Sequence, residues 1–424
     1  MHKRLHANEE KITKRLKLNP QRQAILHKIE KKLCQVEQVQ PSPIGDIVTI
    51  NENEGIGKLL FESDILLTER QMEEISNENG HGRKKRQAFK DKDYPQNLWP
   101  DGIVHFSFHN NTTNKLRDLF RHGALKWQRE TCLSFYEYIH APERIELKND
   151  SGCWSYVGNA HKIQTLSLGE GCETIGTAAH EIGHALGFFH SHGRHDRDEH
   201  IQIDETKVKE FSSSFSADKT RLDTMIPLDR KYIDTIGSHF ISFYDKLMMN
   251  THYKCLDKCK SNKSAAKCAM GGFPNPKDCS KCVCPGGYGG TLCNERPTGC
   301  GEILQATTDY TKFEDVIGYP GIKGLNDNDF FLKCNYWIEV PLGRYVEIRF
   351  DNFTDLDAVG KSYVGGCYFA GFEIKAQKDQ RTTGYRFCSR TYAGEVFKSA
   401  KNIVPIITYS RVWPVKTELR YRMV

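Results

Sequence analysis

The sequence predicts a multidomain α+β protein, and three observations lead to this fold class. The chain has 424 residues, of which 38% are apolar and 27% charged. It is therefore too apolar for a disordered protein, and it is long enough for more than one domain of ~100–200 residues. Its fifteen cysteines are spread unevenly, because only one precedes residue 131 and eleven lie from Cys255 to Cys388. Apolar residues recur at helical spacing in the first half and alternate with polar residues after residue 300.

Charge and hydropathy exclude two classes of partner. The net charge is +6, and residues 1–40 alone hold ten Lys or Arg against four Asp or Glu, so the rest of the chain is balanced. A nucleic-acid-binding protein needs basic charge spread over a folded face, and we therefore expect no nucleic-acid partner. Because no run of eighteen or more apolar residues occurs, we also expect no membrane span.

Cysteine density and glycosylation motifs indicate a secreted, extracellular protein. Small cysteine-rich modules are typical of oxidising compartments. The sequence from Met1 to Arg4 leads into Lys- and Glu-rich sequence without the apolar core of a signal peptide, so we expect the N-terminus of this sequence to be incomplete. Five candidate N-glycosylation sites have Ser or Thr two positions later: Asn110, Asn111, Asn149, Asn262 and Asn352.

Residues 1–86 have the character of a propeptide. Segment 21–36 has the apolar spacing of a helix, and the segment as a whole is polar. It ends in the basic run Arg83-Lys84-Lys85-Arg86. Such a run is either a solvated charge patch or the site of a convertase-type activating protease, and the secreted context favours cleavage after Arg86. Gln87 would then be the first residue of the mature chain.

Three segments with different patterns follow. Residues 87–255 contain a strand-like run over 103–108 and helical spacing of apolar residues over 116–127. Residues 256–296 are rich in Cys, Gly and Lys, and they are too short and polar to bury a core without crosslinks. Residues 300–424 alternate apolar and polar positions in short runs separated by turn residues, which predicts an all-β sandwich.

The segment from Thr177 to His190 carries the residues with a defined chemistry. His180 and His184 are four residues apart, so on a helix they project from one face and can bind one zinc ion at ~2.0–2.1 Å. Glu181 lies on the adjacent flank, where it is placed to hold and deprotonate the attacking water. Gly187 can adopt the left-handed conformation that ends a helix, after which His190 returns as a third ligand.

The third histidine separates this motif from a chance match. A His-Glu-x-x-His sequence alone also occurs in buried helices. The positions of Gly187 and His190 are not explained by the packing of a helix, so they argue against a chance match. We therefore predict one zinc ion per chain. Three protein ligands leave a coordination position for water, which is typical of a catalytic site. The implied reaction is peptide hydrolysis, in which Glu181 takes the proton of the attacking water and passes it to the leaving nitrogen.

The sequence His180-Glu181-x-x-His184-x-x-Gly187-x-x-His190, followed by Arg194-x-Asp196-Arg197-Asp198, resembles the astacin family of metzincin zinc metalloproteases, especially its nematode branch. The resemblance covers nearly the whole chain. It implies a two-lobed α/β peptidase domain over 87–255, an EGF-like module over 256–296 and a CUB-like sandwich over 300–424 that binds protein partners or substrate. The implied function is that of a secreted zymogen zinc endopeptidase acting on extracellular proteins such as matrix or cuticle collagens.

The resemblance also implies a zymogen switch. In zymogens of this family, an aspartate in a Phe-x-Gly-Asp element of the propeptide occupies the zinc position meant for water. The matching stretch here is Phe61-Glu62-Ser63-Asp64, with Ser in place of the usual Gly. Asp64 is therefore the implied zinc ligand of the zymogen, and an ordinary surface carboxylate is the alternative interpretation.

The resemblance further implies how the cysteines pair. Cys34 is left over in the propeptide, where we expect an unpaired thiol. A redox or zinc motif at Cys279-x-x-Cys282 is the competing interpretation, but no second ligand pair follows at zinc-ribbon spacing. The expected disulfides are Cys132–Cys255, Cys153–Cys172, Cys259–Cys279, Cys268–Cys282, Cys284–Cys293, Cys300–Cys334 and Cys367–Cys388.

Two departures from the family pattern bear on activity. Family members have a Ser-x-Met-His-Tyr stretch below the zinc, and none occurs between Asp204 and Asp223, so the peptidase domain is about thirty residues short. Met225 is a poor candidate for the missing methionine. Ser191 replaces the Glu that binds the new N-terminus in many relatives, and Ser cannot form that salt bridge. The alternative function is therefore a catalytically impaired splice or gene-model variant that acts as a zinc-containing EGF/CUB binding protein.

Overall fold

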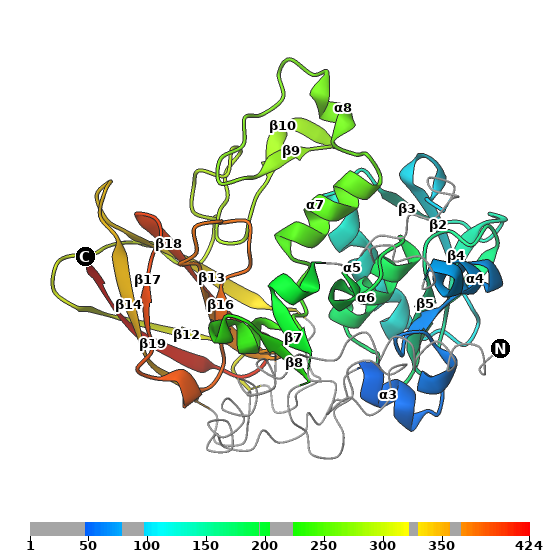
Figure 1. Ribbon diagram of the computed structural model, residues 1–424, viewed down its shortest axis with the longest axis horizontal. Helices are drawn as coiled ribbons and strands as arrows, with labels where there is room; N and C mark the ends of the chain where they lie inside the picture. Colours follow the sequence, from blue (N-terminus) through cyan, green and yellow to red (C-terminus); the bar gives the residue numbers. More distant parts are fainter. Residues whose placement is uncertain (1–46, 79–96, 195, 204–223, 322–329, 357–365) are drawn as a thin grey trace. The chain divides into compact units, whose positions relative to one another are not determined.

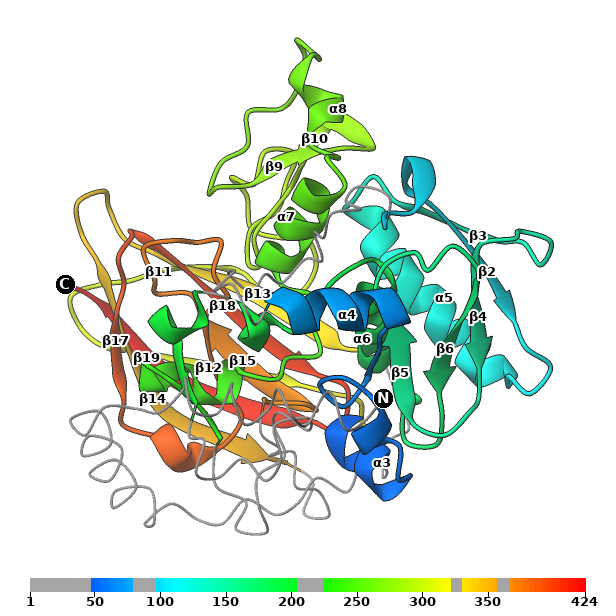
Figure 2. The same ribbon diagram turned by 45° about the vertical axis from the view of Figure 1, so that its right-hand side comes forward.

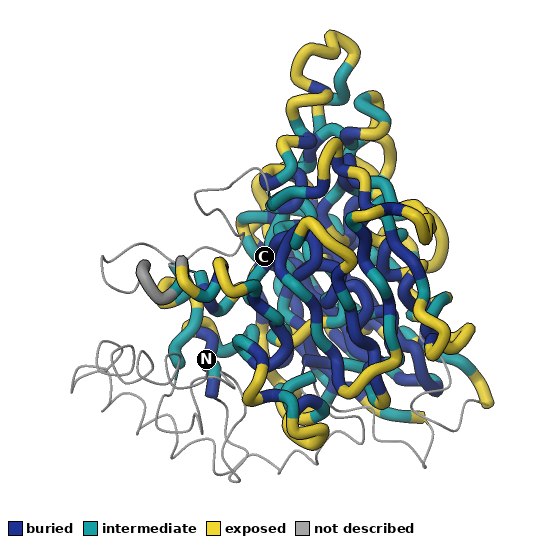
Figure 3. The backbone as a smooth tube through the Cα atoms, turned by 90° about the vertical axis from the view of Figure 1, so that its right-hand side faces the viewer, coloured by how far each residue is buried: buried dark blue, intermediate teal, exposed yellow. Residues whose placement is uncertain are grey.

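The computed structural model describes residues 47–78, 97–194, 196–203, 224–321, 330–356 and 366–424 (Figure 1). The chain divides into two compact units, one of residues 1–129 and 133–229 and the other of residues 130–132 and 230–424. Buried stretches follow the strands and the helices packed on them, whereas exposed stretches lie mainly in the connections (Figure 3). Within the described ranges, no helix has both the length and the apolar character that crossing a bilayer requires.

A six-stranded sheet of order β1-β5-β6-β4-β2-β3 forms the centre of the first unit. Its strands β2, β3, β4 and β6 are parallel, β5 is antiparallel to β6, and β1 is parallel to β5. The strand predicted over 103–108 is confirmed as β2. The strands are β1 (Ile65–Leu66), β2 (Ile103–Phe108), β3 (Ser134–Glu137), β4 (Arg144–Lys148), β5 (Cys153–Tyr156) and β6 (Ile163–Leu168).

Two helices of the first unit, α5 (Asn114–Arg129) and α6 (Ile175–Ala185), pack against each other. The apolar face of α5 is buried, which confirms the helix predicted over 116–127. Gly123 lets the helices approach closely, because a Cβ added there would lie 3.0 Å from the backbone nitrogen of Ala179. Trp127 Nε1 donates to the carbonyl of the same Ala179 at 2.9 Å. Helix α5 therefore fixes the middle of α6.

Residues 47–78, which belong to the predicted propeptide, contribute α3 (Ile47–Asn53), η1 (Gly57–Leu59), β1 and α4 (Glu69–Glu78) to the first unit. These elements lie next to β5, at the end of the sheet opposite β3 (Figure 2). Ile65 and Leu67 form an apolar cluster with Val157 and with the partly buried side chains of Phe61, Met72, Ile75 and Phe189. The helix expected over 21–36 and Cys34 lie outside the described residues.

Short elements complete the first unit. The zinc-motif helix is followed by η3 (Ser191–Gly193) and η4 (Arg197–Glu199), and η2 (Pro100–Gly102) precedes β2. A two-stranded antiparallel sheet joins β7 (Ile201–Ile203) to β8 (Met225–Pro227), and Met225 pairs with Ile203. The place of the missing Ser-x-Met-His-Tyr stretch, residues 204–223, lies outside the described residues.

The second unit begins with η6 (Arg230–Thr235) and α7 (Phe243–His252), and the small elements α8 (Asp257–Lys260), β9 (Phe273–Asn275) and β10 (Asp278–Val283) follow. Its C-terminal part contains two sheets, of order β11-β13-β18-β15-β16 and β12-β19-β14-β17. The alternating pattern after residue 300 is therefore that of two sheets, with η7 (Arg390–Tyr392) in a connection. The strands are β11 (Ile303–Gln305), β12 (Thr311–Ile317), β13 (Leu332–Glu339), β14 (Val346–Asp355), β15 (Ala370–Ile374), β16 (Tyr385–Phe387), β17 (Val396–Lys398), β18 (Ile403–Ser410) and β19 (Val415–Met423).

The division between the two units falls after Asp229, whereas the sequence pattern places the end of the peptidase domain at Cys255. Within the second unit, segment 230–244 packs on the C-terminal sheets. Thr235 Oγ1 donates to the carbonyl of Gly384 at 3.3 Å, and the Tyr244 hydroxyl donates to Asp379 at 2.8 Å. With its mixed sheet, helices and C-terminal β-sheets, the chain is a multidomain α+β protein, as predicted.

The described residues contain seven disulfides, and they are the pairs that the family resemblance implies. They join Cys132 to Cys255, Cys153 to Cys172, Cys259 to Cys279, Cys268 to Cys282, Cys284 to Cys293, Cys300 to Cys334, and Cys367 to Cys388.

Candidate active site

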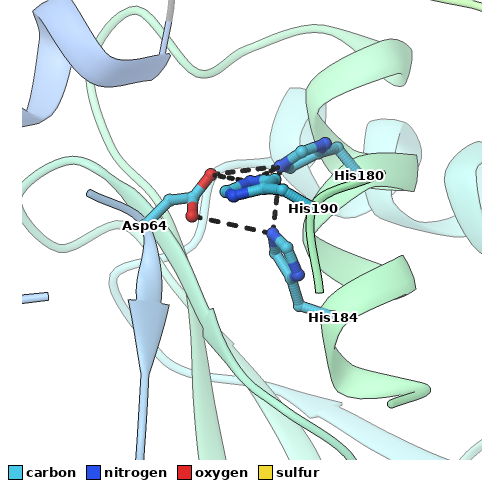
Figure 4. Close-up of side chains that lie close together, drawn as sticks. All are labelled: Asp64, His180, His184 and His190. Atoms are coloured by element: carbon cyan, nitrogen blue, oxygen red, sulfur yellow. Dashed lines mark hydrogen bonds and ion pairs between the residues drawn. The ribbon is translucent and has the colours of Figure 1, made fainter. Parts of the chain in front are cut away.

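Helix α6 places two histidines on one face, and the chain after it brings a third to the same point (Figure 4). The Nε2 atoms of His180 and His184 are 3.0 Å apart, and those of His180 and His190 are 3.3 Å apart. Thr174 caps the start of this helix by accepting a hydrogen bond from the Thr177 amide. The spacing of four residues between His180 and His184 thus places both rings on one face of the helix, about one turn apart.

The turn that returns His190 is built from local backbone contacts. Gly187 has a φ of 106°, which is in the region that favours glycine. Around it the Phe188 amide donates to the carbonyl of Gly183 at 3.1 Å. The Phe188 ring then packs edge-on against Trp127, with ring centroids 6.1 Å apart. Because Phe188 is buried, the direction of the chain toward His190 is fixed.

Hydrogen bonds at the far side of two rings set their tautomers. His184 Nδ1 lies 2.7 Å from the carbonyl oxygen of Phe188, and His190 Nδ1 lies 3.0 Å from Glu62 Oε2. A carbonyl and a carboxylate only accept, so both Nδ1 atoms carry the proton. In the neutral rings, the Nε2 lone pairs therefore point at the centre of the cluster, as metal ligation requires.

The residues present fit a zinc ion. Four ligands at the zinc distance of ~2.0–2.1 Å in a tetrahedron are about 3.3 Å from one another. Asp64 Oδ2 lies 3.1 Å from His180 Nε2 and 3.0 Å from His190 Nε2, close to that separation. Asp64 and the three histidines each offer one ligand atom within 4.8 Å of the others. Three imidazole nitrogens and one carboxylate oxygen are donors that zinc accepts.

Charge and burial act in opposite directions in this cluster. Burial by itself would raise the pKa of Asp64, but electrostatic interaction and hydrogen bonding with the surrounding histidines hold it well below its usual range. Burial would lower the pKa of His190, and the Asp64 carboxylate instead raises it well above the usual value. For His180 burial prevails and lowers the pKa to about 4. Asp64 is therefore ionised in this cluster, where its carboxylate lies against the imidazole rings.

Glu181 is the buried carboxylate beside the histidines. Its side chain is 0% exposed, and neither oxygen has a hydrogen-bond partner within the described part of the chain. Burial, followed by the charge of Asp64, raises its pKa well above the usual value, and the charge of His190 opposes this in part. Both oxygens of Glu181 therefore remain available to contact a water molecule, as a general base requires.

A second carboxylate of the same segment, Glu62, is a site residue that the sequence does not mark. Glu62 Oε2 contacts His190 Nδ1 and lies 3.6 Å from His192 Nε2. Burial by itself would raise the pKa of Glu62, but the hydrogen bonds and charges of these two histidines lower it. Both Glu62 and Ser63 have positive φ, 49° and 76°. Glycine adopts positive φ readily, so the Gly that is usual at the Ser63 position of the Phe-x-Gly-Asp element is the sequence signal for such a turn.

The remaining sequence-predicted residues divide into three groups. Arg86 and Gln87 lie outside the described residues. Asn110, Asn111, Asn149 and Asn262 are exposed, whereas Asn352 is half-buried and donates to Thr354 Oγ1 at 2.9 Å. Ser191 is exposed at the start of η3. The structure thus brings Asp64, Glu181 and the three histidines together and places the glycosylation motifs elsewhere.

Comparisons with known proteins agree with this geometry. A sequence model of the Astacin peptidase family matches residues 91–216. "Zinc metalloproteinase nas-31" of Caenorhabditis elegans is 38% identical over 88% of this chain, which spans 65% of the length of that relative. "Zinc metalloproteinase nas-17" of the same organism is 32% identical over 89% of this chain and 90% of its own length.

Among solved structures, the hatching enzyme "High choriolytic enzyme 1", a zinc protease from Oryzias latipes, is 20% identical. It covers 39% of this chain and 98% of its own, with a TM-score of 0.35. The relative nas-17 matches this chain over most of both sequences. On that basis, the chain belongs to the astacin family of peptidases.

Proposed function

We propose that this protein is a secreted zymogen zinc endopeptidase that hydrolyses peptide bonds in extracellular proteins. One observation carries the proposal: three histidine Nε2 atoms and an Asp64 oxygen converge on one point, with the unpartnered carboxylate of Glu181 beside them. The names of the relatives, zinc metalloproteinases, support the same activity and favour it over a binding protein without catalysis.

The residues of the chain have distinct parts in the proposed reaction. His180, His184 and His190 would hold zinc, which supplies Lewis-acid polarisation of the scissile carbonyl when bound. Glu181 takes the proton of the attacking water and passes it to the leaving nitrogen. The geometry supports this role, because Glu181 is buried beside the histidines and neither of its oxygens has a hydrogen-bond partner within the described residues.

The position of Asp64 supports a latent state of the uncut chain. Asp64 is 2% exposed and lies within 4 Å of all three histidines, so it would supply a fourth donor at the position that the attacking water needs. A convertase-type protease cutting after Arg86 would detach the segment and leave Gln87 as the new N-terminus. Because Ser191 offers no carboxylate to that terminus, we expect release of Asp64 to be the main consequence of cleavage.

The remaining segments would determine where the enzyme acts. The disulfide-bonded residues 256–296 and the two-sheet region 300–424 suit EGF-like and CUB-like modules that localise the enzyme on protein partners. Seven disulfides and four exposed glycosylation motifs support secretion. For substrates we propose structural proteins of the matrix or cuticle, such as collagens.

The test uses the full chain, secreted from insect cells behind a supplied signal peptide and cut after Arg86. We expect one zinc per chain by elemental analysis and casein hydrolysis that a zinc chelator stops. Glu181→Ala should keep the zinc and lose hydrolysis, whereas His184→Ala should lose both. A fully cut chain that holds zinc but does not hydrolyse casein or collagen would overturn the proposal in favour of a binding protein.

A further inference from the structure

The strongest feature that the proposed reaction does not use is a buried amide in the propeptide segment. Asn51, in α3, is 0% exposed. Its Nδ2 donates to the carbonyl of Cys153 at 2.7 Å and to the carbonyl of Ser63 at 2.8 Å. Its Oδ1 accepts from the amide of Cys153 at 2.8 Å. One side chain therefore pairs with both backbone groups of the first residue of β5.

On the peptidase side of this contact, two glycines leave room for side chains of α3. A Cβ on Gly152 would lie 2.1 Å from Asn51 Oδ1 and 2.5 Å from Ile56 Cδ1. Across the Cys153–Cys172 disulfide, a Cβ on Gly171 would lie 3.1 Å from Ile50 Cδ1. Gly152, Cys153 and Gly171 thus form a notch, called here the glycine notch, that accommodates side chains of α3.

The chemistry of the notch selects a carboxamide. Cys153 presents one N–H donor and one carbonyl acceptor side by side, and a primary amide offers the complementary pair in one plane, as a neighbouring strand would. A carboxylate has no donor for the carbonyl and would be a buried unpaired charge. An apolar side chain would leave both backbone groups unsatisfied.

The same amide is connected to Asp64 through the backbone. Asn51 holds the carbonyl of Ser63, in the turn where Glu62 and Ser63 have positive φ. One residue later, the Ser155 amide donates to the carbonyl of Asp64 at 3.1 Å, and β1 then pairs with β5. Because an L residue other than glycine resists positive φ, this turn needs external contacts to persist, and Asn51 supplies one of them.

We propose that the glycine notch is a second propeptide-binding site, specific for a carboxamide, and that Asn51 is a positioning residue that keeps Asp64 against the histidines. This proposal rests on the zymogen function proposed above and adds a site outside the metal cluster. The propeptide is then held along the edge of β5 at several points, of which Asp64 is one. Gln71 Nε2, donating to the carbonyl of Val157 at 2.9 Å, holds the other end.

The experiment measures hydrogen exchange in the full, uncut chain carrying Glu181→Ala, so that self-cleavage cannot occur. Asn51→Leu removes the amide at similar volume, and Asn53→Ala, at an exposed position of the same helix, is the matched control. We expect the Cys153 and Ser155 amides to exchange about 10- to 100-fold faster in Asn51→Leu, because buried backbone partners lose their hydrogen bonds. The control should match the parent.

Amides in the central pair of strands β4 and β6 report whether the fold is intact. If Asn51→Leu also loses protection in β4 and β6, hydrogen exchange is measured in the milder variant Asn51→Ala and compared with the same control. Protection of Cys153 and Ser155 that equals the parent in a folded Asn51 variant would overturn the proposal.

This readout needs no catalysis, so its failure is distinct from failure of the proposed function. An active peptidase whose Cys153 protection does not depend on Asn51 would contradict only the glycine notch. An inactive chain that loses this protection in Asn51→Leu would support the notch and contradict the peptidase. With Glu181 intact, the uncut Asn51→Leu chain should also hydrolyse a peptide about 10- to 100-fold faster than the uncut parent.

Discussion

Replacing Gly123 with alanine tests how tightly α5 holds the helix that carries His180 and His184. In an ordinary helix this substitution is stabilising, by about 1 kcal/mol. Here the new Cβ would lie 3.0 Å from the Ala179 nitrogen and 3.1 Å from the Ala178 carbonyl carbon. Both contacts are with the backbone of α6, which cannot rotate away as a side chain can.

The two effects have opposite signs, and the overpacking effect is the larger. Inserting a methyl group into a packed helix contact costs about 1–3 kcal/mol. The expected net result is a destabilisation of about 1 kcal/mol at the contact between α5 and α6. Because Ala179 precedes His180, a shift of α6 by a few tenths of an ångström also displaces a histidine of the cluster.

Hydrogen exchange of the α6 amides is the direct assay, with Lys115→Ala at an exposed position of α5 as the control. We expect the amides of Ile182 and Ala185 to exchange about fivefold faster in Gly123→Ala, which corresponds to about 1 kcal/mol. Zinc should also leave the protein faster. Slower exchange in Gly123→Ala would mean that helix propensity prevails, and it would refute the close contact from which the magnitude is worked.

Three further predictions concern latency and the second unit. Asp64→Ala in the uncut chain should raise peptide hydrolysis toward the rate of the cut chain, measured with a quenched fluorescent peptide; an uncut variant as inactive as the parent would contradict the role of Asp64. Arg386→Ala should destabilise the second unit by about 3–5 kcal/mol in urea unfolding. The buried Glu373 carboxylate, 7% exposed and 3.0 Å from Arg386, would lose its guanidinium partner and keep the hydrogen bond from the Gly384 amide. The pair Glu373→Gln with Arg386→Met should restore most of the loss. Burial lowers the pKa of Lys375 to about 8, so between pH 8 and about 10 the unfolded chain binds more protons than the folded one. The free energy of unfolding should therefore rise with pH in this range, by at most about 3 kcal/mol. Lys375→Met should remove this rise, and an unchanged pH slope of the unfolding free energy in the variant would show that another group is responsible.

Local patterns predict those elements whose residues are close in sequence. The structure reproduces the bounds of strand 103–108 and helix 116–127 to within two residues. The three histidines His180, His184 and His190 likewise lie on one helix and the turn after it, so their spacing in the sequence predicts that their rings meet. The position of Glu181 next to them follows for the same reason.

Other features depend on residues far apart in the sequence, which periodicity does not relate. Asp64 and His180 are 116 residues apart, and within the sequence only the family resemblance connects them. Neither Glu62 nor Asn51 is predictable in this way, because a lone Glu or Asn in a polar segment has no spacing that marks its partner. The boundary after Asp229 also differs from the sequence boundary, because contacts with the C-terminal sheets decide it.

By itself the sequence determined the α+β class, the cysteine-rich and alternating segments, and a three-histidine motif with its carboxylate. These features are encoded by neighbours on one helix, one strand or one turn. The tertiary structure decided which distant groups meet them: the propeptide carboxylates at the histidines, the amide at Cys153, and the close approach of α5 to α6. Such contacts form only when the chain has folded, because burial and hydrogen bonding between remote segments fix them and local conformational preference does not.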